Sequence, residues 1–163
     1  MNNKLTIQKQ YTFSKILIYV SMAFNLYRSL FLVFSKYESL DSDVFACYFI
    51  AIAAVFASIT GIYPFAVHYI GRKRLLLSLM WHAGSIILTF SAIYRGFGVL
   101  SGEHHVFPSF SASLYFSTVT WTTLGYGDFQ PTEQLQLLAA GQAGLGYLFL
   151  GLIVAIISVE IME

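Results

Sequence analysis

The chain has 163 residues, of which 57% are hydrophobic and only 10% are charged; its formal net charge is +1 and its mean hydropathy +0.69. Soluble domains carry about a quarter charged residues, so this composition excludes a soluble globule and indicates that lipid is the main solvent. The low net charge argues against nucleic acid as a partner, since that needs a basic patch. The one cysteine, Cys47, offers neither an intrachain disulfide nor a metal framework.

Residues 1–74 predict a cytoplasmic tail followed by two transmembrane helices. The apolar run 16–34 is too long for the core of a signal peptide and has no small-x-small cleavage site, so we expect it to span the membrane. A second span is expected over 44–70. Arg28, within the first run, either pairs with an acid of the following loop or extends to lipid headgroups. It does not form the arginine repeat of a voltage sensor.

Residues 75–163 predict two further spans, over 75–94 and 134–159. All four apolar runs are long enough for a bilayer core, which needs about 20 residues, whereas the apolar run 109–122 between the last two is too short and is expected to be re-entrant. Cytoplasmic segments are enriched in lysine and arginine. The tail and the cluster Arg72-Lys73-Arg74 carry three basic residues each, which places both termini in the cytoplasm and the re-entrant segment outside.

Residues 120–128 read Thr-Trp-Thr-Thr-Leu-Gly-Tyr-Gly-Asp. Gly125 and Gly127 can adopt positive φ without steric cost, which allows successive carbonyls to turn toward one axis. Irregular backbone at membrane depth is tolerated only where protein covers it or where it lines a watery path. A line of inward-facing carbonyls can replace the hydration shell of a cation. The alternative to a cation-binding segment is a glycine-rich turn that only connects two transmembrane helices.

Residues 122–128 resemble the selectivity filter of potassium channels, usually Thr-Val-Gly-Tyr-Gly-Asp, and 113–123 are similar to the pore helix before it. The main departure is Leu124 in place of valine or isoleucine, an apolar change that we expect to be tolerated. The resemblance implies an all-α membrane protein with four transmembrane helices, in which a pore helix (109–122) and a filter lie between helices 3 and 4. With one pore loop in each chain, it implies a homotetramer in the lipid bilayer.

By the same resemblance, K⁺ ions would be bound in the filter, mainly by backbone carbonyls of Thr123, Leu124, Gly125, Tyr126 and Gly127 and by the Thr123 hydroxyl. The Tyr126 ring would point away from the axis and pack on pore-helix aromatics, with Tyr115, Phe116 and Trp121 as candidates. Asp128 would either form a ring of carboxylates at the pore mouth or cap the following turn. Some family members pair this aspartate with a pore-helix acid, but the matching residue here is Val119.

Other polar and small residues leave alternatives open. Gly144 and Gly146 in the last helix provide either a bend or close packing between helices. Glu160 and Glu163 either attract cations at the cytoplasmic exit or are solvated helix-end charges. His104 and His105, with Glu103, either sense pH in an outer loop or have no role, and His82 is expected to be a hydrogen-bonded packing residue.

The sequence therefore predicts a potassium-selective channel of the cell membrane. The alternatives are a weakly selective cation channel and a non-conducting subunit that regulates another channel. No catalytic pair, nucleophile with base or metal-ligand spacing indicates an enzyme. No soluble ligand-binding domain is expected within the chain.

Overall fold

The computed structural model describes residues 16, 20, 23, 49–56, 58, 59 and 72–161. Within the two predicted N-terminal spans, the described positions are all helical. The rest of these spans, the N-terminal tail and the predictions made for Arg28, Cys47 and Glu163 lie outside the described residues.

Two long helices form the frame of the described region. They are α3 (Arg72–Phe97) and α5 (Gln136–Ile161), the latter entered through a 3-10 turn, η1 (Glu133–Leu135). Both are long and apolar enough to cross a membrane, over Lys73–Phe97 and Glu133–Ser158. Helix α3 runs past the predicted end of its span and stops where Gly98, with φ of +78°, donates its N–H to the Tyr94 carbonyl at 2.9 Å. This is a helix end that favours glycine.

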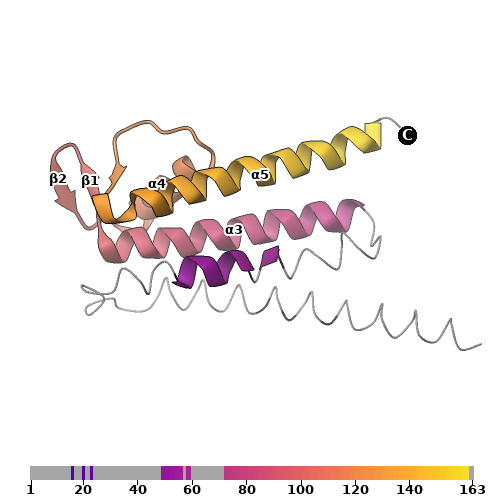
Figure 1. Ribbon diagram of the computed structural model, residues 1–163, viewed down its shortest axis with the longest axis horizontal. Coiled ribbons are helices and arrows are strands. Elements are labelled where there is room, and N and C mark those ends of the chain that lie inside the picture. Colours follow the sequence, from indigo (N-terminus) through magenta and orange to yellow (C-terminus); the bar gives the residue numbers. More distant parts are fainter. Residues whose placement is uncertain are drawn as a thin grey trace, which may run out of the picture.

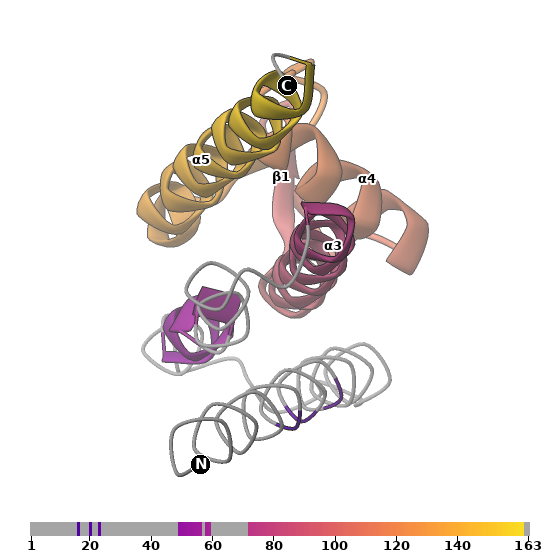
Figure 2. The same ribbon diagram turned by 90° about the vertical axis from the view of Figure 1, so that its right-hand side faces the viewer.

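The short helix α4 (Phe110–Trp121) packs against both long helices, as the two perpendicular views show (Figures 1 and 2). It occupies the predicted pore-helix segment 109–122. Its first turn is capped by Ser109, whose hydroxyl accepts a hydrogen bond from the Ala112 N–H at 3.3 Å. Buried apolar side chains from all three helices form one core, including Ile86, Phe116 and Leu138.

A small antiparallel sheet, with strand order β2-β1-β3, closes one end of the three helices. Its strands are β1 (Val99–Ser101), β2 (His104–Val106) and β3 (Gln130–Pro131). The tight turn between β1 and β2 contains Gly102 with φ of +62°, as a two-residue hairpin turn requires. The sequence predicted only a loop here and a wholly α-helical chain. The sheet joins the end of α3 to the segment that follows Asp128.

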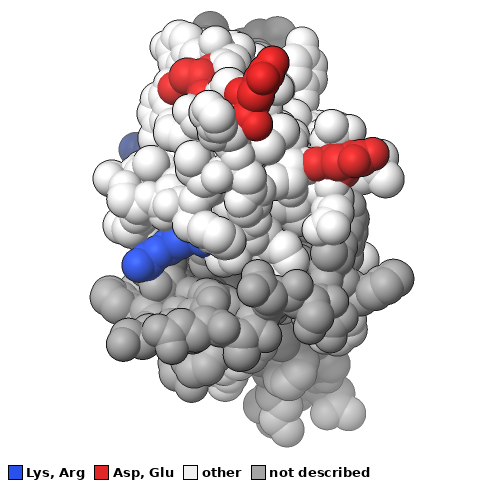
Figure 3. Space-filling view, turned by 90° about the vertical axis from the view of Figure 1, so that its left-hand side faces the viewer, with Lys and Arg blue, Asp and Glu red and all other residues white. Residues whose placement is uncertain are grey.

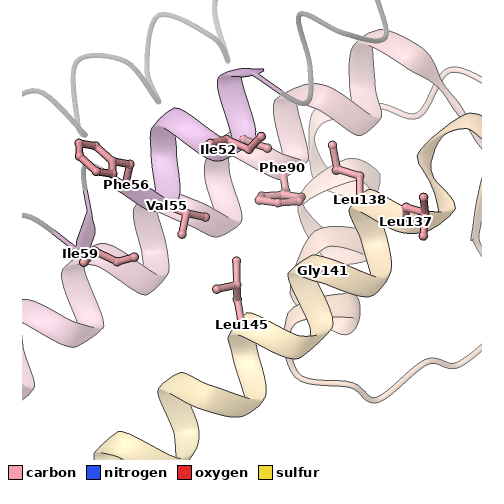
Figure 4. Close-up of a pocket in the computed structure, with 10 residues that line it drawn as sticks. Ile52, Val55, Phe56, Ile59, Phe90, Leu137, Leu138, Gly141 and Leu145 are labelled. Carbon is pink, nitrogen blue, oxygen red and sulfur yellow. The ribbon is translucent and has the colours of Figure 1, made fainter.

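The helical residues 49–56, 58 and 59 lie beside α3 and α5 and line with them an open pocket of about 460 Å³ (Figure 4). Its walls are aliphatic and aromatic side chains such as Val55, Phe90, Leu138 and Leu145. Such a lining offers no oxygen ligands, so this cavity does not provide a site for a metal cation.

Candidate functional site

The segment after α4 begins as an extension of the helix and then leaves it. The N–H groups of Thr122, Thr123 and Leu124 donate to the carbonyls of Thr118, Thr120 and Val119 at 2.9, 3.1 and 3.0 Å, respectively. The Thr122 hydroxyl also donates to the Thr118 carbonyl, at 2.9 Å. The last turn of α4 therefore fixes the start of residues 123–127, the segment predicted to be a filter.

Along this segment the sign of φ alternates. Thr123, Gly125 and Gly127 have φ of +58°, +54° and +81°, whereas Leu124 and Tyr126 have negative φ. Alternation in the sign of φ allows successive peptide groups to turn to the same side of the chain, unlike a β-strand, in which they alternate. The arrangement is suited to a row of carbonyl oxygens that face one axis.

Both glycine and a β-branched residue occupy the positions with positive φ. A Cβ placed on Gly125 or Gly127 would find no atom within 4 Å, so within the chain these glycines are required by their φ alone. Thr123 is different, because a β-branched residue at positive φ is a genuine outlier. Strain of this kind typically costs about 1–3 kcal/mol and concentrates at functional sites. The sequence did not predict positive φ at Thr123.

The outer end of the segment is held by aromatic and polar contacts to α4. The Tyr126 ring stacks on Tyr115, with ring centroids 6.4 Å apart and planes inclined by 3°. The Tyr115 hydroxyl forms a hydrogen bond to Asp128. Desolvation, followed by this hydrogen bond and the negative charge of Asp128, raises the pKa of the exposed Tyr115.

The other two predicted supports contact different partners. Phe116 packs edge-on against Tyr94 and Phe129, at centroid distances of 4.6 and 6.5 Å. Trp121 packs edge-on against Phe149 of α5, at 5.2 Å. Of the three aromatic candidates, Tyr115 is thus the one whose ring pairs with Tyr126, while Phe116 and Trp121 join α4 to its neighbouring helices.

The two glycines proposed for a bend lie within one continuous helix, α5. A Cβ on Gly146 would lie 1.8 Å from the Trp121 carbonyl oxygen, so this glycine permits the close approach of α5 and α4. A Cβ on Gly144 would meet nothing within 4 Å. In this structure, Gly146 therefore fits the packing alternative.

The end of the molecule that carries the filter segment is rich in acids. Figure 3 faces this end and shows several carboxylate side chains on it, together with basic side chains; the acids of the connecting segments here are Glu103, Asp128 and Glu133, and Arg95 lies in the last turn of α3 at the same end. The exposed Lys73 and Arg74 lie at the opposite end of α3. No group of three or more His, Cys, Asp or Glu side chains within the described residues could hold a metal ion. Any cation bound at residues 123–127 must therefore rely on backbone and hydroxyl oxygens.

The histidines are placed separately from the filter segment. His82 is fully buried in α3, with Nδ1 2.7 Å from the Ser78 carbonyl oxygen, while its Nε2 has no hydrogen-bond partner among the residues that the structure describes. His105 Nε2 lies 3.0 Å from the Phe97 carbonyl oxygen and its ring packs edge-on against Phe107. His104 is exposed in the same hairpin.

Sequence reasoning missed one buried polar residue, Gln142 of α5. Its side chain accepts a hydrogen bond from the Tyr94 hydroxyl at 2.8 Å and donates to the Ser117 carbonyl and hydroxyl at 3.1 and 2.8 Å. A primary amide within an apolar membrane helix is itself a signal, because burying it without partners is costly. That signal does not identify the partners, which lie 25 and 48 positions away in the sequence.

Comparisons with known proteins agree with this geometry. A family model described as "Ion channel" matches residues 76–163. The bacterial protein LctB of Geobacillus stearothermophilus is 32% identical over 118 residues, which cover 63% of this chain and 85% of LctB. Potassium voltage-gated channel subfamily KQT member 4 of Homo sapiens is 37% identical over 91 residues, which cover 53% of this chain.

The matched region spans only 12% of the length of the human channel subunit. No solved structure matches the chain. The family match covers α3, α4, the filter segment and α5, which is the region in which the sequence resembles a channel pore. It also confirms the prediction that the chain is not an enzyme. The chain belongs to the ion channel family and carries a pore domain of the potassium-channel type.

Proposed function

We propose that this chain forms a homotetrameric channel that conducts K⁺ selectively and passively across a membrane. The observation that carries the proposal is the alternating sign of φ over residues 123–127. Four such segments around an axis would present stacked rings of carbonyl oxygens, with the Thr123 hydroxyls below them. These oxygens would exchange for the water shell of a permeating K⁺ ion.

The exposed surfaces of the single chain support assembly around an axis. Residues 122–128 are all exposed, although they are apolar or uncharged except for Asp128. In the most apolar window of α5, 17% of residues are buried, compared with 56% in α3. Exposed side chains on α5 include Leu137, Tyr147 and Leu150. A fourfold arrangement would cover part of these surfaces and place the filter segment at the centre.

The charge distribution supports the direction in which ions would enter. Carboxylates lie at the filter end, and basic residues at the start of α3 lie at the opposite end. Basic residues favour the cytoplasmic side, so the filter end would face outward. There, four copies of Asp128 would raise the local concentration of cations. With two spans before α3, both termini would be cytoplasmic, and we propose the cell membrane as the location.

Ion flux into liposomes that contain only the purified chain tests the proposal. Outward gradients of K⁺ and, separately, of Na⁺ should drive flux in the K⁺ case only, and Ba²⁺ should block it. Gly125→Asp should abolish it, because an aspartate at this φ and position disrupts the carbonyl rings. Equal Na⁺ flux would instead indicate a weakly selective cation channel. Absence of both fluxes across a range of pH and voltage would indicate a non-conducting subunit.

A further inference from the structure

A fully buried polar network joins the three helices α3, α4 and α5. Its members are Tyr94 of α3, Ser117 of α4 and Gln142 of α5, each 0% exposed. The Gln142 amide bonds to both other residues, and the Ser117 hydroxyl donates in turn to the Ile87 carbonyl of α3 at 2.8 Å. We call these three side chains the interhelix clamp.

Every hydrogen bond of the interhelix clamp has a fixed direction. The Ser117 carbonyl can only accept, so Gln142 Nε2 must face it, and Oε1 then faces the Tyr94 hydroxyl. The Ser117 hydroxyl gives its proton to the Ile87 carbonyl and accepts from Nε2. Because each donor meets an acceptor, the network is satisfied in one arrangement, and shifting one helix against another would leave buried polar atoms unpaired.

A second contact repeats the first one turn further along. Gln142 meets Ser117, and Gly146, four residues later on α5, meets Trp121, four residues later on α4. Residues four apart lie on the same face of a helix. Two contacts in matched register fix both the height and the rotation of α4 relative to α5.

The position of α4 determines where the filter segment begins, because backbone hydrogen bonds join the two. The carbonyls of Val119 and Thr120, in the turn between the two contacts, accept the N–H groups of Leu124 and Thr123. A displacement of α4 would thus move the residues at which positive φ begins. We propose that Gln142 is a positioning residue for ion selectivity, acting through Ser117 and the last turn of α4 on the lower end of the filter. This inference depends on the proposed function.

The test uses the full chain, purified and assembled, and measures how K⁺ and Na⁺ protect the assembly against thermal dissociation. This readout needs a filter that binds K⁺ but no open gate. Gln142→Met keeps the size of the side chain and removes its hydrogen bonds. Ser58→Ala is the control, because it removes a buried hydroxyl whose hydrogen bond among the described residues lies within its own helix, at 2.9 Å to the Ala54 carbonyl.

If the wild-type assembly is protected no better by K⁺ than by Na⁺, the proposed function itself fails. If it is protected, Gln142→Met should raise the half-protecting K⁺ concentration about ten- to twentyfold, the scale expected for losing three interhelical hydrogen bonds. The K⁺ over Na⁺ flux ratio should fall in parallel, and Ser58→Ala should change neither.

An unchanged half-protecting K⁺ concentration in an assembled Gln142→Met protein would overturn the inference and leave Gln142 as a packing residue. If Gln142→Met fails to assemble, the half-protecting K⁺ concentration of Tyr94→Phe tests the same inference. It removes one hydroxyl, leaves the Gln142–Ser117 bonds in place and should raise the K⁺ requirement by a smaller factor. A wild-type K⁺ requirement in Tyr94→Phe would equally overturn the inference.

Discussion

The pore helix and the filter segment are adjacent in the sequence but are held in opposite ways. Helix α4 is fixed by buried side chains, through hydrogen bonds to α3 and α5 and through the close contact of Gly146 with Trp121. Residues 122–128 are exposed and are held at their two ends, by the last turn of α4 and by the contacts of Tyr115.

This difference indicates that the two regions have different structural roles. Under the proposed function, the filter segment supplies conformation, because its carbonyls would have to stay free for ions and could not be used up in hydrogen bonds within the protein. The pore helix supplies position, because its buried Ser113 and Ser117 side chains are hydrogen-bonded to the neighbouring helices α3 and α5. Substitutions in the pore helix should therefore impair assembly, whereas substitutions in the filter segment should impair conduction.

The largest effect is expected from Gly146→Ala, which places a methyl group against the Trp121 carbonyl. Overpacking of this kind costs about 1–3 kcal/mol per site and occasionally more, and it would recur in each subunit. Both assembly, measured by size-exclusion chromatography, and K⁺ flux should be lost. Gly144→Ala is the matched control and should retain both, since its Cβ meets no atom within 4 Å in the chain. Equal behaviour of the two variants would contradict the packing role.

Gly125→Ala should abolish conduction while assembly survives. The substitution forces an alanine into left-handed backbone, at a cost of about 1–2 kcal/mol in each subunit, and favours a conformation that turns the carbonyl away. Gly84→Ala in α3, where a Cβ has free space, is the control for loss of a glycine. Liposome flux and size-exclusion chromatography should be measured on the same preparations. Flux reports on the filter segment, and chromatography reports on the assembly that the pore helix supports. Normal K⁺ flux in Gly125→Ala would show that positive φ at this position is not needed.

Tyr115→Phe should have an intermediate effect, limited to the outer end of the filter. It keeps the ring that stacks on Tyr126 but removes the hydrogen bond to Asp128. Currents in planar bilayers should begin normally and then decline faster than in the wild type, without loss of assembly. Asp128→Asn weakens the same hydrogen bond by changing its acceptor. Currents of this variant should decline at a similarly increased rate. Sustained wild-type currents in Tyr115→Phe would exclude a role for this bond in holding the filter.

The smallest effect is expected from Ser91→Ala, which removes one hydrogen bond between α3 and α4. The Ser91 hydroxyl lies 3.1 Å from that of Ser113, which keeps its bond to the Phe110 carbonyl. Interhelical hydrogen bonds in membranes average about 0.6 kcal/mol, so the dissociation temperature should fall only slightly and K⁺ over Na⁺ selectivity should be unchanged. A loss of selectivity as large as that of Gln142→Met would show that the interhelix clamp has no special role.

The features that could be predicted from the sequence are those encoded locally. Long apolar runs predicted α3 and α5, and the string around Gly125 and Gly127 predicted an irregular segment after a short helix. The filter motif also identified the family, because glycine spacing and the flanking hydroxyl and acid stand close together in the chain.

The features that could not be predicted depend on contacts between distant residues. The β1–β3 pairing joins Leu100 to Gln130, and the Gln142 bonds join three helices. The positive φ of Thr123 opposes the intrinsic preference of threonine and arises where the N–H groups of this segment bond back to α4. Local propensity and periodicity carry no information on such partners.

If the alternating backbone of residues 123–127 selects K⁺, the selectivity should appear in the reversal potential of the channel. Purified wild-type protein in a planar bilayer would be recorded with equal concentrations of K⁺ on one side and Na⁺ on the other. We expect a reversal potential far from zero, with the sign that K⁺ selectivity requires, and we expect Gly125→Ala to abolish it. A conducting wild-type protein that reverses near zero would contradict the claim.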